Sequence, residues 1–192
     1  MMQEFIEAVK NMIAGQINEI HTALPGKIVS FDTKTGLATV LPVMKFRMKD
    51  GTTVPYPQIT GVPVVLPQSC KQQVTIAQPV KAGDGCLIII AEHSIEYWLY
   101  GQETDTDLSF DLTDAFCIPG LFAAANPVLA EACEQNAVIV DVKGTRAVIR
   151  RDEISVTAKN IVLNGDLRVN GTVSAEGIAA DEQGATDPEN GG

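Results

Sequence analysis

Some residues of this sequence could take part in catalysis, but none lies in a spacing that catalysis requires. A hydrolase nucleophile would lie in a Gly-x-Ser-x-Gly turn, a phosphate loop would end in Gly-Lys-Ser/Thr, and a zinc peptidase would carry His-Glu-x-x-His. The sequence contains none of these motifs. Its two histidines, His21 and His93, stand far apart, and we interpret His93, next to Glu92, as a surface residue. We therefore expect a non-enzymatic protein with no catalytic residues and no cofactor.

The acidic stretch after residue 101 does not fit a calcium loop. Such a loop needs oxygen ligands at fixed offsets, a glycine at its sixth position and a glutamate at its twelfth. Counting from Asp105, these positions are Phe110 and Phe116. The cysteines form no Cys-x-x-Cys pair, so we interpret them as buried thiols and predict no metal site. They are Cys70, Cys86, Cys117 and Cys133.

The charge of the chain argues against nucleic acid as a partner. Lys and Arg number 14 against 24 Asp and Glu, which gives a formal net charge of −10. Such a surface repels a phosphate backbone. No apolar run approaches the ~18 residues of a membrane span, and the N-terminus lacks the features of a secretory signal. We expect a protein that is made and assembled in a cytoplasm.

The N-terminal segment, residues 1–24, has the pattern of an amphipathic helix. Its apolar residues recur at intervals of three and four, with charged and polar residues between them, and Pro25-Gly26 prevents its continuation. Two roles remain open for this helix: it covers one end of the following domain, or it packs against its own copies in an oligomer. Docking onto a neighbouring protein would need the same pattern. The apolar residues are Phe5, Ile6, Val9, Met12, Ile13, Ile17 and Ile20.

Residues 25–121 have the pattern of a small β-barrel. Short apolar runs are separated by turn-rich segments at residues 32–36, 49–51 and 81–85. Closure into an OB-fold-like barrel would remove the exposed edges of such a small sheet. Residues 101–136 read as irregular, with a connector at residues 122–136. The predicted strands are residues 27–31, 38–44, 62–66, 74–77, 86–91 and 95–99.

Residues 137–180 predict a stalk that one chain cannot complete. Apolar and polar residues alternate from Val138, and from Ile161 the alternation becomes a six-residue repeat with apolar first and third positions and glycine at the fifth. A single-chain β-helix needs several coils of about three such units each, so three units cannot form a core. Three chains wound about one axis would form a triple-stranded β-helix. The predicted inward residues are Ile154, Val156, Ile161, Leu163, Leu167, Val169 and Val173, with Gly165 and Gly171 at positive-φ turns.

An ordinary hairpin or meander appended to the barrel is the alternative interpretation of residues 137–180. The last residues, 181–192, are rich in glycine and acidic side chains. This composition is typical of a flexible tail or a mount for a separate tip protein.

The order of several motifs resembles the central spike proteins of contractile phage tails and related injection machines. The resemblance spans about residues 25–178 and includes the C-terminal repeat. It implies a homotrimer whose OB-fold domain sits on the baseplate hub under the tail tube. Its β-helix would pierce the outer membrane of the target cell when the sheath contracts. The matching stretches are GKIVSFD (26–32), ATVLPV (38–43), ITGVPVV (59–65), PVKAGDGCLIII (79–90) and DLTDAFCIPGL (111–121).

The sequence departs from this family at its C-terminal end, and two other functions remain open. Some spikes end in an iron site with a His-x-His motif, whereas both histidines here lie far from the C-terminus. One alternative is an OB-fold binding module for nucleic acid or oligosaccharide, with Tyr56 and the segment of residues 97–100 as stacking platforms. The other is a fragment of a tail fibre that binds a receptor.

Overall fold

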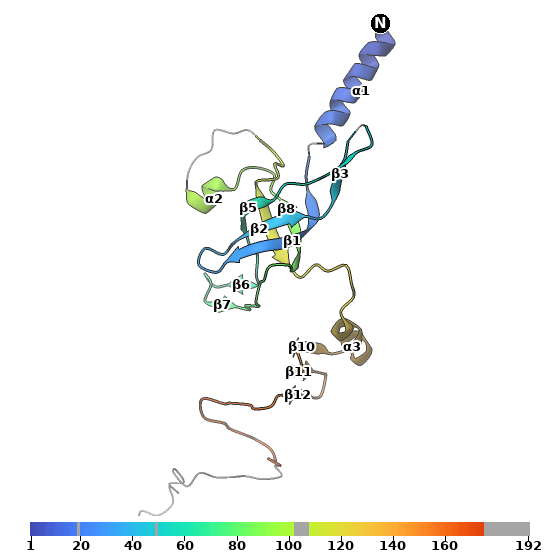
Figure 1. Ribbon diagram of the computed structural model, residues 1–192. Helices are drawn as coiled ribbons and strands as arrows, with labels where there is room; N and C mark the ends of the chain where they lie inside the picture. The colour runs from blue at the N-terminus through green and yellow to red at the C-terminus, as the bar shows by residue number, and fades with distance from the viewer. Residues whose placement is uncertain (19, 49, 102–107, 175–192) are drawn as a thin grey trace, which may run out of the picture. The chain divides into compact units, whose positions relative to one another are not determined.

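The computed structural model describes residues 1–18, 20–48, 50–101 and 108–174. The chain divides into two compact units, Met1–Ala125 and Asn126–Gly192, and each is described by itself (Figure 1). Among the described residues, no helix is long and apolar enough to cross a membrane. The predicted tail or tip mount at residues 181–192 lies outside the described part of the chain.

The first unit begins with helix α1, Met2–Asn18, which confirms the helical prediction for this segment. The helix is shorter than residues 1–24, because strand β1 begins at Ala23. Apart from half-buried Val9, every α1 side chain that the structure describes is exposed.

Five strands of the first unit form one antiparallel sheet in the order β5-β2-β1-β8-β9 (Figure 1). Strand β1 is long enough to pair with two neighbours: Gly26–Asp32 pair with β2, and Ala23–Lys27 pair with β8. Its register shifts between Ile28 and Ser30, which marks a bulge that bends the strand. The strands are β1 Ala23–Asp32, β2 Leu37–Pro42, β5 Ile59–Pro63, β8 Gly85–Ile90 and β9 Ala115–Pro119.

The two edge strands of this sheet meet and close it into a partly open barrel. Val64, just after β5, forms a parallel bridge with Cys117 of β9, and the Val65 N–H donates to the Cys117 carbonyl at 2.8 Å. A five-stranded, partly open barrel is the architecture of the OB-fold. The predicted OB-fold-like barrel is confirmed.

The core of the barrel follows from the alternation of its strands. In β2 and β8 the residues of one face are buried, and Val40 and Ile88 are fully inaccessible. Two glycines permit close packing beside this core. A Cβ on Gly26 would lie 2.5 Å from Ile88 Cδ1, and one on Gly85 would lie 1.9 Å from the Leu121 carbonyl oxygen. Neither position has room for a side chain.

Two small hairpins leave the barrel between its strands. β3 (Lys45–Arg47) pairs with β4 (Thr53–Pro55), and β6 (Gln68–Ser69) pairs with β7 (Val74–Thr75). The first hairpin was not predicted, although the turn at residues 49–51 was. The Asp50 carboxylate accepts the Thr52 N–H at 2.9 Å in this turn, as short acidic side chains commonly do.

The predicted strand at residues 95–99 is wrong, because this segment forms helix α2, Glu96–Tyr100. Its aromatic residues favour strands by propensity, but a distant contact decides the local structure. The buried carboxylate of Asp114 accepts the Ile95 N–H at 3.0 Å, and Gly101 ends the helix in the left-handed conformation.

Residues 101–136 are also more ordered than predicted. They contain β9, which completes the barrel, and helix α3, Pro127–Gln135, within the predicted connector. Helix α3 has clear end signals: the Asn126 side chain accepts the Val128 N–H, Pro127 occupies the first turn, and Asn136 adopts φ 48° at the C-cap.

The second unit consists of α3 and a three-stranded antiparallel meander. Strands β10 (Val138–Val142), β11 (Thr145–Ile149) and β12 (Ile154–Thr157) lie in the order β10-β11-β12. Lys143 and Gly144 connect β10 and β11 with φ values of 49° and 96°, typical of a type I′ hairpin turn. Residues 158–174 form no helix or strand. In a single chain, residues 138–157 thus adopt the meander of the alternative interpretation, and the trimeric β-helix stays a prediction.

Candidate oligomer interface and binding groove

One face of the meander consists almost entirely of aliphatic side chains, and it is exposed. The strand register places Val138, Ile149 and Ile154 in one row across the sheet, and Val140, Ala147 and Val156 in the next. Val142 continues the face beside Thr145. The relative exposures are 63% for Val138, 58% for Val140, 69% for Val142, 44% for Ile149, 70% for Ile154 and 51% for Val156.

The opposite face of the meander is partly covered within the same unit. Val148 is 9% exposed there, and Arg146 bridges strand and helix. Its guanidinium lies 2.6 Å from Glu131 of α3 and 3.1 Å from Asp141 of β10. The hydrogen bond from Arg146 lowers the pKa of Glu131, and the same bond raises the pKa of Arg146. Helix α3 is therefore held to one face, and the aliphatic face stays open.

The open face is a candidate oligomer interface on energetic grounds. Burying one Val or Ile side chain contributes roughly 1.5–3 kcal/mol relative to leaving it in water. Contiguous exposed apolar surface of this kind marks interaction sites in soluble proteins. Burial against other chains would recover this free energy, since the described residues of the second unit leave the face exposed.

The structure brings together two of the seven predicted inward residues, Ile154 and Val156, which lie on the aliphatic face. The other five lie on residues 158–174, outside any strand, where a single chain does not bury them. Their exposures are 60% for Ile161, 64% for Leu163, 70% for Leu167, 47% for Val169 and 65% for Val173.

The two predicted turn glycines differ from each other. In one chain, Gly165 has φ 141°. The φ of Gly171 lies outside the positive range, although the chain bends there. In one chain, the two Asn-Gly pairs are therefore not equivalent turns. Turns at these two glycines in an assembled stalk stay a prediction.

Five members of the aliphatic face were not among the predicted inward residues: Val138, Val140, Val142, Ala147 and Ile149. Their signal was in the sequence, because they alternate with polar or half-buried residues at period two, as Ile154 and Val156 do.

Two of the four cysteines are not buried thiols as predicted. Cys86 and Cys117 are inaccessible in the barrel core, whereas Cys70 and Cys133 are exposed, and all four are free. A hydrogen bond with Cys86, together with burial, raises the pKa of Cys117 far above its usual range. This buried pair is thus part of the core. Within the described ranges, no group of three or more His, Cys, Asp or Glu residues could hold a metal ion.

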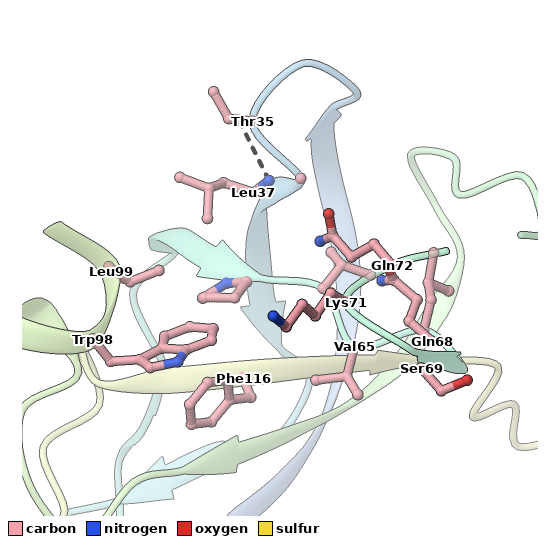
Figure 2. Close-up of a pocket in the computed structure, with 14 residues that line it drawn as sticks. Thr35, Leu37, Val65, Gln68, Ser69, Lys71, Gln72, Trp98, Leu99 and Phe116 are labelled. Atoms are coloured by element: carbon pink, nitrogen blue, oxygen red, sulfur yellow. Dashed lines mark hydrogen bonds between the residues drawn. The ribbon is translucent and has the colours of Figure 1, made fainter. Parts of the chain in front are cut away.

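The first unit carries a separate feature, a groove of about 600 Å³ beside α2. It lies between the β1–β2 turn, the segment after β5, the β6–β7 hairpin and α2 (Figure 2). Its lining is largely apolar, and the Trp98 ring meets the Phe116 ring edge-on with centroids 5.9 Å apart. The apolar lining residues are Leu37, Pro63, Val64, Val65, Leu66, Trp98, Leu99 and Phe116.

The hairpin at the groove has an unusual backbone. Cys70, Lys71 and Gln72 have φ values of 51°, 54° and 67°, so three consecutive residues other than glycine adopt the left-handed conformation. Each such residue costs roughly 1–2 kcal/mol relative to the right-handed form. Strain of this kind concentrates at functional sites, which makes the groove a second candidate site.

Comparison with known protein families gives one match, which covers the barrel. Residues 24–120, about half of the chain, match the family described as the phage protein Gp138 N-terminal domain. No curated protein matches the chain. The family match supports a structural role in a phage particle. By the extent of this match, the chain belongs to the phage protein Gp138 N-terminal domain family.

Proposed function

We propose that this protein is the homotrimeric central spike of a contractile tail baseplate and that it has no enzymatic activity. The observation that carries the proposal is the aliphatic face of β10–β12, followed by a repeat whose apolar residues are equally exposed. A phage particle is the setting that the family match supports.

Three copies of the chain would cover what one chain leaves in water. Closed rotational symmetry lets each aliphatic face meet its copies about one axis without leaving a free apolar edge. The short repeat units after Ile161 would pair with units of the neighbouring chains and bring their apolar positions to the centre. The chain would then exchange its single-chain form over residues 158–174 for interchain strands.

An interlocked stalk of this kind suits a mechanical function. Many interchain strand hydrogen bonds must break together before such a stalk bends or comes apart, so it transmits axial force. In this proposal the barrel sits on the baseplate hub below the tail tube. The stalk, with or without a separate tip protein, pierces the outer membrane of the target cell when the sheath contracts.

The trimer is tested with paired substitutions in the repeat. Leu167→Asp or Val169→Asp would place three unpaired carboxylates around one axis, at a cost of several kcal/mol. Val162→Asp is the matched control, because Val162 occupies the second position of a repeat unit, which faces outward in this proposal. Light scattering should give three chains for the wild type and Val162→Asp, and fewer for the other two variants. An unchanged trimer from Leu167→Asp and Val169→Asp would show that the inward assignment is wrong.

The location is tested on particles that carry the chain. Antibody against the barrel should label the baseplate end of the tail in electron micrographs. Particles with Leu167→Asp should attach to cells and contract their sheaths but fail to deliver their contents. Labelling along the fibres or at the head would contradict the proposed location.

A further inference from the structure

We propose that the groove beside α2 binds an extended segment of another particle protein, in which an aliphatic side chain adjoins a carboxylate. This inference concerns the barrel alone. It does not depend on the trimeric stalk, so either proposal can fail without the other.

The shape and lining of the groove suit an aliphatic side chain. Its volume of about 600 Å³ falls in the range of ligand-binding clefts. Trp98 is 69% exposed and Val65 is 46% exposed, although both lie on the groove wall. Large, exposed aromatic side chains of this kind are typical anchors of protein interfaces.

The charge of the groove is the reason to expect a carboxylate on the partner. Lys71 is the one charged residue in its lining, and it forms no ion pair with any residue that the structure describes. The chain as a whole is acidic, with a net charge of −10, whereas the charge in this groove is positive. A carboxylate placed in the groove would meet one positive charge, unpaired among the described residues, beside apolar surface, where the attraction is less screened than in bulk water.

The backbone of the hairpin positions this cation. Figure 2 shows the Lys71 side chain extending from the β6–β7 hairpin toward Trp98, across the opening of the groove. Lys71 is the middle residue of the three consecutive left-handed residues. The backbone conformation of this turn thus sets where the Lys71 side chain leaves the hairpin, and strain of this kind is concentrated at functional sites.

A protein segment fits the groove better than a nucleic acid or a polyphosphate. Those ligands carry several negative charges and need several cations, whereas the lining offers one. The exposed side chains of Gln68, Ser69 and Gln72 supply hydrogen-bond donors and acceptors along one wall, which match the polar groups of an extended backbone.

Trp98 makes the test direct, because it is the only tryptophan of the chain. The full-length protein is titrated with the capped pentapeptide Gly-Leu-Asp-Leu-Gly while Trp98 fluorescence is recorded. We expect a saturable change in emission. The peptide with Asn in place of Asp should bind about threefold more weakly, a size within the range of an exposed ion pair. The peptide with Ser in place of both Leu should also bind more weakly, because it buries less apolar surface. Raised salt should weaken the binding of the Asp peptide and leave the binding of the Asn peptide unchanged.

Charge reversal supplies the matched comparison. Lys71→Glu should invert the preference, so that a peptide with Lys in place of Asp binds more tightly than the Asp peptide. Lys81→Glu makes the same change in net charge at a turn outside the groove, and it should keep the wild-type preference. Circular dichroism of both variants checks that the barrel is folded.

Several results would overturn the inference. No saturable change with the Asp peptide, or equal binding of the Asp and Asn peptides, would remove the charge argument. A change in Trp98 emission with oligothymidylate, but not with the peptides, would assign the groove to nucleic acid. A smaller oligomer of Lys71→Glu by light scattering would identify a second copy of this chain as the occupant.

Discussion

The barrel and the meander use the same alternation of residues with opposite results. In the barrel, the inward residues Val40 and Ile88 are completely buried. In the meander, the aliphatic residues Val142 and Ile154 are 69% and 70% exposed. Alternation segregates apolar side chains to one face of a sheet, but it does not provide the surface that covers this face.

The difference lies in how much chain is available for cover. Five barrel strands curve until β5 and β9 meet, so the sheet covers itself. Three meander strands are too few to close, and α3 packs against the other face. A small sheet gains stability when its apolar face is covered, and an exposed face of this kind is typical of an interaction site. The barrel is therefore expected to fold alone, and the C-terminal unit to complete its fold by association.

The largest effect should come from charging the barrel core. Ile88→Asp would bury a carboxylate that has no partner among the core side chains, a cost that exceeds the stability of a typical small domain. We expect loss of the β-sheet signal in circular dichroism. Ile118→Asp on the neighbouring strand β9 is the control, because Ile118 is 37% exposed. If Ile88→Asp melted like Ile118→Asp, the proposed barrel core would be wrong.

A charge on the meander should separate association from folding. Val140→Asp should abolish the oligomer, because Val140 is exposed in the middle row of the aliphatic face, while the barrel keeps its melting transition. Thr157→Asp, on the opposite face in register with Arg146, should leave the oligomer intact. Sedimentation velocity distinguishes the two variants. An oligomer that survives Val140→Asp would mean that this face is not the interface.

Substitutions of the two stalk glycines, Gly165 and Gly171, should have smaller effects than these charged substitutions. Gly165→Ala should destabilise the assembled form by about 1 kcal/mol, since alanine avoids the positive φ of this position. Gly171→Ala should have little effect where the assembled stalk keeps the single-chain backbone, because the φ of Gly171 in one chain lies outside that range. Dissociation of the oligomer in urea measures both. Equal effects of the two substitutions would show that the turn at Gly165 changes on assembly.

The smallest effect should come from the contact between α3 and the meander. The pKa of Glu131 is lowered by Arg146, so the stabilisation it gives is present above the ordinary carboxyl pKa and is lost as the pH falls through the lowered value. The difference in melting temperature between wild type and Glu131→Gln should therefore shrink from pH 7 to pH 3. Glu134→Gln, on the same helix, should show no such trend. A difference that is constant with pH would exclude the ion pair as its source.

Sequence reasoning found the parts of the fold that local pattern determines. Strands β1, β2 and β8, the turns between the strands and the N-terminal helix follow from periodicity and turn residues, whereas β5 was predicted only in part and β9 was missed. Helix α2 was missed because the Asp114 carboxylate, 19 residues away, fixes its start, and no local pattern reports that contact. Helix α3 carried readable signals in Asn126, Pro127 and Asn136, which the irregular composition around them hid.

The candidate interface was only partly predictable, for a related reason. Alternation identified Ile154 and Val156, and it would have identified Val140 with them. The strand register that gathers these residues on one face requires the pairing of β10, β11 and β12. The groove could not be predicted at all, because its walls come from four separate segments and its cation depends on a strained turn.

The most direct test of the account is the solution mass of the purified full-length protein, repeated after deletion of residues 137–192. We expect a mass of three chains for the full-length protein and a folded, mostly monomeric product after the deletion. A full-length protein that is monomeric at micromolar concentration would contradict the proposed stalk. A truncated protein that stays trimeric would move the interface to the barrel or to α1.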